Sequence, residues 1–96
     1  MPPMTKDDVK ARLQQIEGWV RDGDEIEKKF AFDDFAASMV FVNRVAELAE
    51  AADHHPDISI KYNRVKLTLS THSEGGVTEK DFALAAQIDA AAQPSI

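Results

Sequence analysis

The feature that most restricts the fold of this 96-residue chain is a run of alternating apolar and polar residues on both sides of a tight turn. The apolar positions are Ile58, Ile60 and Tyr62 before the turn, and Val65, Leu67 and Leu69 after it. Asn63-Arg64 lies between the two runs, and asparagine tolerates the left-handed backbone that tight turns need. The pattern predicts an antiparallel β-hairpin with one apolar face.

Three helices and a second hairpin are predicted around it. The expected elements are a first helix that a capping box at Thr5–Asp8 opens and Gly18 ends, strands at 19–21 and 25–32, a long helix from Asp33 or Asp34 to about Ala52, and a last helix after a second capping box at Thr78–Asp81. The order α-β-β-α-β-β-α predicts an α+β fold, with a four-stranded antiparallel sheet and three helices on one face. We expect a single domain over residues 1–96.

The long helix is apolar around most of its circumference. Only Asn43, Glu47 and Glu50 form a coherent polar stripe. A helix on the surface of a monomer needs one apolar face, so a second apolar face needs a second covering surface. We expect that surface to be another copy of the chain, in a homodimer or homotetramer formed through this helix and a sheet edge. A central helix buried within one monomer is the alternative.

The composition excludes several classes of protein. The net charge is −6 and the basic residues are scattered without a basic stripe, so direct binding of nucleic acid is not expected. The absence of cysteine rules out disulfides and thiolate zinc sites. No stretch approaches the ~20 apolar residues of a membrane-spanning helix, and the first residues lack the apolar run of a signal peptide. A cytoplasmic protein is expected.

All three histidines lie in or beside the predicted hairpin: His54, His55 and His72. Imidazole can both donate and accept a proton near neutral pH. With the turn at Asn63-Arg64, residue 55 is expected opposite residue 72, which brings the three rings into one neighbourhood. By alternation, His72 is expected on the polar face of its strand. The arrangement favours proton-transfer chemistry.

Other interpretations of these residues stay open. The histidines can be neighbours by chance, or they can hold zinc or iron together with Asp53 or Asp81, although no common ligand spacing is present. Asp81 has a sufficient local role as the capping partner of Thr78, and it can also orient an imidazole. Glu50 lies one turn before His54, so it either shares a helix edge with that ring or belongs to the solvated polar stripe.

Taken together, these residues resemble the signature of the pterin-4a-carbinolamine dehydratases. The matching elements are Glu50-x-x-x-His54-His55-Pro56, Tyr62-Asn63, Leu69-Ser70-Thr71-His72 and Asp81, and the similarity extends over nearly the whole chain. The resemblance implies dehydration of 4a-hydroxytetrahydropterin to quinonoid dihydropterin, which recycles the pterin cofactor of aromatic amino acid hydroxylases. It implies no metal and no organic cofactor.

The resemblance also assigns roles to individual residues. His54 and His72 would be general acids, each for one stereoisomer of the hydroxyl, and His55 would bind substrate and assist as a base. The residues that would line the pterin pocket are Asp53, Ser70, Thr71 and Ser73, with Glu50 and Asp81 as supporting acids. Members of the family have a four-stranded sheet with helices on one side, and they form dimers and tetramers.

Two positions depart from the family pattern. Ile58 stands where the animal members carry tryptophan, and Ser73 replaces an acidic residue. Animal members also act as dimerisation cofactors for a homeodomain transcription factor. A non-enzymatic, oligomerising protein-interaction module is therefore the alternative function.

Overall fold

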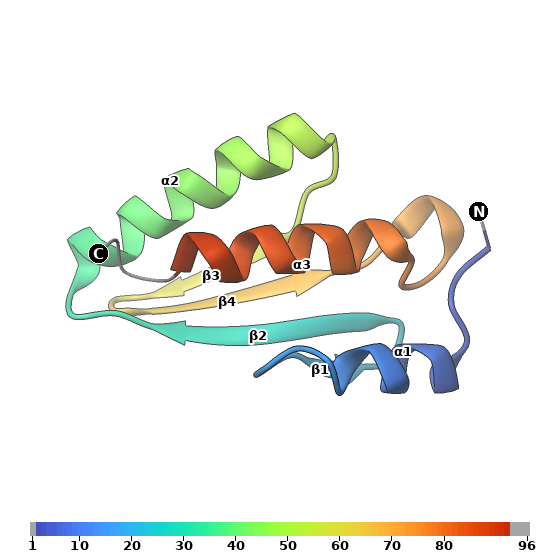
Figure 1. Ribbon diagram of the computed structural model, residues 1–96. Coiled ribbons are helices and arrows are strands. Elements are labelled where there is room, and N and C mark those ends of the chain that lie inside the picture. The colour runs from blue at the N-terminus through green and yellow to red at the C-terminus, as the bar shows by residue number, and fades with distance from the viewer. Residues whose placement is uncertain (1, 93–96) are drawn as a thin grey trace.

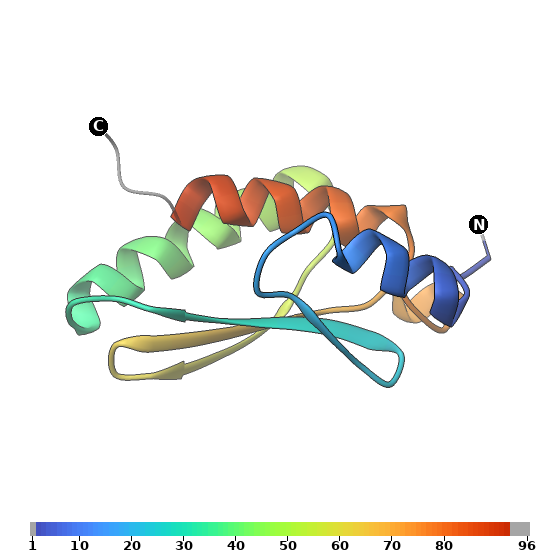
Figure 2. The ribbon, with the colours of Figure 1, turned by 60° about the horizontal axis from the view of Figure 1, so that its bottom comes forward.

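The structure is a computed structural model that describes residues 2–92. Its elements are α1 (Lys6–Leu13), β1 (Val20–Asp22), β2 (Glu25–Ala31), α2 (Phe35–Ala52), β3 (Asp57–Lys61), β4 (Arg64–Leu69), a short 3₁₀ helix η1 (His72–Glu74) and α3 (Glu79–Ala92). The strands form one antiparallel sheet in the order β1-β2-β4-β3 (Figure 1). Figure 2 shows the helices on one side of this sheet. The predicted α+β class and element order are confirmed; the ends of the predicted domain, Met1 and residues 93–96, lie outside the described residues.

The core lies between the sheet and the helices. Every second residue of β2 and β4 points toward the helices, as the alternation predicts. The buried apolar side chains are Ile26, Phe30, Val65, Leu67 and Leu69 from the sheet, Phe41, Val45 and Ala49 from α2, Phe82, Leu84, Ala85 and Ile88 from α3, and Val9, Trp19 and Val77. Each fully buried Val, Leu, Ile or Phe side chain stabilises the fold by roughly 1.5–3 kcal/mol. This packing holds the ends of α2, β4 and α3 in fixed relative positions.

The β3–β4 hairpin turns one residue earlier than predicted. Lys61 pairs with Arg64, so Tyr62 and Asn63 form the loop, and Tyr62 has a φ of 54°. Asn63 instead holds the residue after β2. Its side-chain amide donates to the backbone carbonyl of Phe32 at 3.0 Å, and its backbone carbonyl accepts the N–H of Phe32 at 2.8 Å. The predicted turn at Asn63-Arg64 is wrong because this long-range contact holds Asn63 and residue 62 supplies the left-handed backbone.

The long helix α2 has one buried face and further apolar residues outside it. Asp34 caps its first turn by accepting the N–H of Ala37 at 2.8 Å. On its outer side Val40 is 71% exposed, and on edge strand β3 Ile58 and Ile60 are partly exposed. Apolar surface is therefore uncovered on α2 and on edge strand β3. Among residues 2–92, no helix combines the length and apolar character needed to span a lipid bilayer.

Candidate active site

His54 and His55, which follow the end of α2, point in different directions. Asp53 closes the helix in the left-handed conformation with a φ of 50°, and its N–H donates to the carbonyls of Ala49 and Glu50. The N–H of His54 also reaches the carbonyl of Ala49, at 3.1 Å. The side chain of His54 is then 11% exposed, whereas that of His55 is 56% exposed. The helix end therefore places one ring against the protein and the other toward solvent.

The start of α3 buries a carboxylate beneath the first of these rings. Thr78 and Asp81 form one half of the predicted capping box, since the N–H of Thr78 donates to Oδ2 of Asp81 at 2.9 Å. The Thr78 hydroxyl accepts the N–H of Lys80 at 3.2 Å in place of that of Asp81. Asp81 is fully buried. A buried carboxylate is costly unless hydrogen bonds or an opposite charge compensate it.

The carboxylate of Asp81 is shared between two distant segments. Its Oδ1 lies 2.6 Å from Nε2 of His54, and its Oδ2 accepts the hydroxyl of Thr71 at 2.9 Å. The single hydroxyl hydrogen of Thr71 is used in that bond, so the Thr78 hydroxyl, 2.8 Å away, donates to Thr71. Asp81 thus caps α3 and holds an imidazole at the same time.

This geometry assigns the two nitrogens of His54. Nε2 carries the hydrogen that it donates to Asp81, as the carboxylate can only accept. Nδ1 makes no hydrogen bond with the described residues. Among these residues every fully buried side-chain nitrogen and oxygen does make one, so Nδ1 is not fully buried. Nδ1 therefore reaches solvent. A ring held through one nitrogen by a carboxylate and free at the other is suited to proton exchange.

His55 has a different acidic partner. Its Nε2 contacts Oε2 of Glu50, and both side chains are largely exposed. Glu50 does not share a helix edge with His54, because α2 ends at Ala52 and the left-handed Asp53 turns the chain away. Exposed pairs of this kind contribute little to stability, about 0–1 kcal/mol. Glu50 orients His55 without anchoring the fold.

His72 lies outside the strand in which it was predicted. Strand β4 ends at Leu69, and His72 begins η1 with an exposed side chain. The observed pairing of Asp57 with Thr68, continued outward, sets residue 55 opposite residue 70, so the predicted register of 55 with 72 is wrong. What links His72 to His54 is Thr71, its immediate neighbour, which bonds the same carboxylate as His54.

The four predicted pocket residues fall into two pairs. The hydroxyl of Ser70 donates to the carbonyl of Asp24 at 3.0 Å, and that of Thr71 is occupied by Asp81 and Thr78. Asp53 and Ser73 are exposed and available to a ligand. Thr78 also belongs to the hydrogen-bond network of Asp81, although the sequence predicts only a capping role for it. Its three-residue spacing from Asp81 is the signal that could have placed it there.

The best-formed grooves of residues 2–92 lie away from the histidines, and these residues form no metal-binding cluster. Three grooves stand out on the described residues, and none of the three is lined by a histidine. Within residues 2–92, no group of three histidine or acidic side chains is arranged to hold a metal ion. The site is defined by its hydrogen bonds, at a surface formed by the ends of α2, β4 and α3.

Comparison with known proteins identifies the class. A family model described as pterin 4 alpha carbinolamine dehydratase matches residues 2–91. A relative from Thermomicrobium roseum is 55% identical over 80 residues, 83% of this chain and 86% of the relative. One from Acidobacterium capsulatum is 52% identical over 90 residues, 94% and 98% of the two chains. Both are provisionally named pterin-4-alpha-carbinolamine dehydratases.

Two solved structures share the fold. A transcriptional coactivator/pterin dehydratase from Brucella melitensis has a TM-score of 0.91 and 38% identity, with 95% of this chain and 99% of that chain covered. A pterin dehydratase-like protein identified as a RuBisCO assembly factor in the alpha-carboxysome has a TM-score of 0.69 and 32% identity, covering 82% and 94%. The fold is that of the pterin dehydratases. This chain belongs to the pterin-4-alpha-carbinolamine dehydratase family.

Proposed function

We propose that this chain dehydrates 4a-hydroxytetrahydropterin to quinonoid dihydropterin, and so recycles the pterin cofactor of aromatic amino acid hydroxylases. Family membership supplies the substrate class. The observation that carries the chemistry is the buried contact of His54 with Asp81, which leaves Nδ1 of the ring open to solvent.

The reaction needs two proton transfers. Hydroxide leaves C4a poorly, so His54 in its doubly protonated, cationic form gives the hydrogen on Nδ1 to the 4a-hydroxyl, which departs as water, while Nε2 keeps the hydrogen that it donates to Asp81. The N5 hydrogen leaves as a proton while the C4a=N5 double bond forms, and His55 accepts it. Asp81 fixes the ring and the hydrogen on Nε2, so that Nδ1 is the nitrogen facing substrate. Each positioned transfer typically contributes ~10²–10⁴-fold.

His72 provides a second acid for the other stereoisomer in this proposal. Its exposed ring follows Thr71, whose backbone N–H is bonded to the carbonyl of Gly76 at 2.9 Å and whose hydroxyl is bonded to Asp81. Asp53 and Ser73 contact the pterin, and Glu50 orients His55. Ser70 and Thr71 support the site from inside the fold, a change from the pocket-lining role that the resemblance implies.

The test is a dehydration assay with each stereoisomer of synthetic carbinolamine. We expect the protein to accelerate the spontaneous reaction, and His54→Gln to lose about 10²-fold or more with one stereoisomer. Lys10→Gln, an exposed change on α1, is the matched control and keeps the wild-type rate. Equal rates for His54→Gln and wild type with both stereoisomers would refute the assignment.

A second candidate function rests on the uncovered apolar surface. Val40 of α2 and Ile58 and Ile60 of β3 are exposed, which suits burial against another chain. We propose that copies of this chain associate through α2 and the β3 edge into a dimer or tetramer. If the dehydration assay shows no acceleration, the same surface supports an oligomerising interaction module as the function of the chain.

A further inference from the structure

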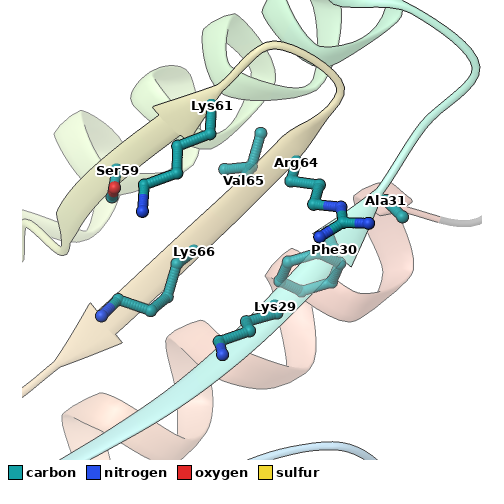
Figure 3. A pocket seen from close by; sticks show the side chains of 8 residues that line it. All are labelled: Lys29, Phe30, Ala31, Ser59, Lys61, Arg64, Val65 and Lys66. Carbon is teal, nitrogen blue, oxygen red and sulfur yellow. The ribbon is translucent and has the colours of Figure 1, made fainter.

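The face of the sheet opposite the helices carries a groove of about 500 Å³ over β2, β3 and β4 (Figure 3). Four of its lining residues are cationic: Lys29, Lys61, Arg64 and Lys66. Lys29, Arg64 and Lys66 alternate along their strands with core residues, so their side chains lie on the helix-free face. The sequence suggested scattered basic residues without a stripe. That interpretation is wrong, because strand pairing collects residues that are far apart along the chain.

The register sets like charges directly against each other. Lys29 pairs with Lys66 across β2 and β4, and Arg64 pairs with Lys61 across β4 and β3. Side chains in such positions have Cβ atoms about 4.5–5.5 Å apart, and like charges there destabilise a sheet. The pairs Lys29–Lys66 and Arg64–Lys61 lie in adjacent rows on this face, and the two cations of each pair repel each other.

The described residues do little to neutralise this cluster. Glu27 lies 3.8 Å from the ammonium of Lys66, and it is the single acidic partner that the four cations have within residues 2–92. The chain as a whole carries a net charge of −6. Four cations gathered on one face of an acidic protein, with one ion-pair partner between them, form a site whose charge is complementary to an anion.

We propose that this groove binds a compact ligand carrying two or more phosphate groups, of about the size of a nucleotide. Its volume lies within the roughly 300–1,000 Å³ typical of small-molecule sites. Arginine can bind phosphate through two parallel hydrogen bonds, and lysines add point charges. Ser59, which also lines the groove and pairs with Lys66, adds a hydroxyl donor.

The limits of the positive region favour a small ligand over a long polyanion. The next row of the same face contains Glu27, Thr68 and Asp57, so the charge reverses after two rows. A nucleic acid strand leaving the groove would meet this acidic row and the net negative charge of the protein. A ligand confined to the two basic rows avoids both.

The test is titration of inorganic triphosphate into the full chain at constant ionic strength, followed by calorimetry and by thermal unfolding. We expect triphosphate to raise Tm. Lys29→Gln and Arg64→Gln should each weaken binding about tenfold, because each removes a charged hydrogen bond to phosphate, and the double variant about 100-fold. Lys10→Gln on α1 is the matched control and should bind as wild type.

A second readout separates this proposal from a loss of folding. Without ligand, Lys29→Gln should have a Tm equal to or above that of wild type, because it relieves repulsion with Lys66. Dehydration activity without triphosphate should be unchanged in both variants, since the proposal does not depend on the histidine site. Either variant binding triphosphate as tightly as wild type, or sulfate raising Tm as much as triphosphate, overturns the proposal. Tighter binding of a single-stranded oligonucleotide or of a polyglutamate peptide overturns it as well.

Discussion

Nε2 of His54 lies 2.6 Å from Oδ1 of Asp81, and this contact joins the end of α2 to the start of α3 across 27 residues of sequence. The other oxygen of the same carboxylate holds Thr71, the residue before His72. The buried side chain of Asp81 therefore sets the position of the His54 ring. It also anchors the segment that carries His72, the second ring proposed as an acid. The fold and the proposed chemistry depend on the same hydrogen bonds.

Asp81→Asn should damage both stability and turnover. An asparagine has one side-chain oxygen, so it cannot accept from all three donors, and its amide hydrogens would face them. We expect the free energy of unfolding to fall by about 2–4 kcal/mol, measured in urea. The dehydration rate should fall about 10–100-fold, as for other groups that orient a histidine. A variant with wild-type values of both would contradict the role given to Asp81.

Thr71→Val tests whether Thr71 positions His54 or contacts substrate. The valine removes a donor to Asp81 and an acceptor for Thr78, so stability should fall by about 1–3 kcal/mol. We expect kcat to fall and KM to stay near wild type in steady-state assays. Thr71→Ser keeps the hydroxyl and should restore kcat. An increase in KM at unchanged kcat would instead indicate direct contact with the pterin.

His54→Ala and His72→Ala should differ in stability while both reduce turnover. Removal of His54 leaves the buried Asp81 without one of its partners, so the free energy of unfolding should fall by about 2 kcal/mol or more. His72 is exposed, and its removal should change stability by less than about 0.5 kcal/mol. Thermal unfolding compares the two variants, and assays with separated stereoisomers should show each failing with a different one.

Val40→Glu should reduce the oligomeric mass measured by size-exclusion chromatography with light scattering. The side chain is 71% exposed within one chain, so the charge should not disturb the fold of the monomer. In an oligomer formed through α2 it would be buried without a partner, which is costly. Lys10→Glu, which adds a negative charge at an exposed position of α1 outside the proposed interface, is the control and should keep the wild-type mass.

Local signals in the sequence were enough to predict the elements and their order. One bond of each predicted capping box forms: Thr5 accepts the N–H of Asp8, and Asp81 accepts the N–H of Thr78, because each pair lies three residues apart along the chain. The alternation in β2 and β4 identified which residues face the core, since a strand turns its side chains to opposite faces in succession. The histidines and Asp81 stood out by residue type and spacing, and the chain proved to belong to the family that they resemble.

The tertiary structure decided what depends on contacts between distant segments. The turn moved to Tyr62-Asn63 because Asn63 bonds Phe32, which lies 31 residues away. His54 and His55 diverged because a left-handed Asp53 ends α2, and pairing of β2, β3 and β4 collected four cations into one groove. Hydrophobic periodicity and helix capping depend on residues a few positions apart, so the sequence shows them directly. A hydrogen bond or strand pair between distant segments forms only when the fold brings those segments together.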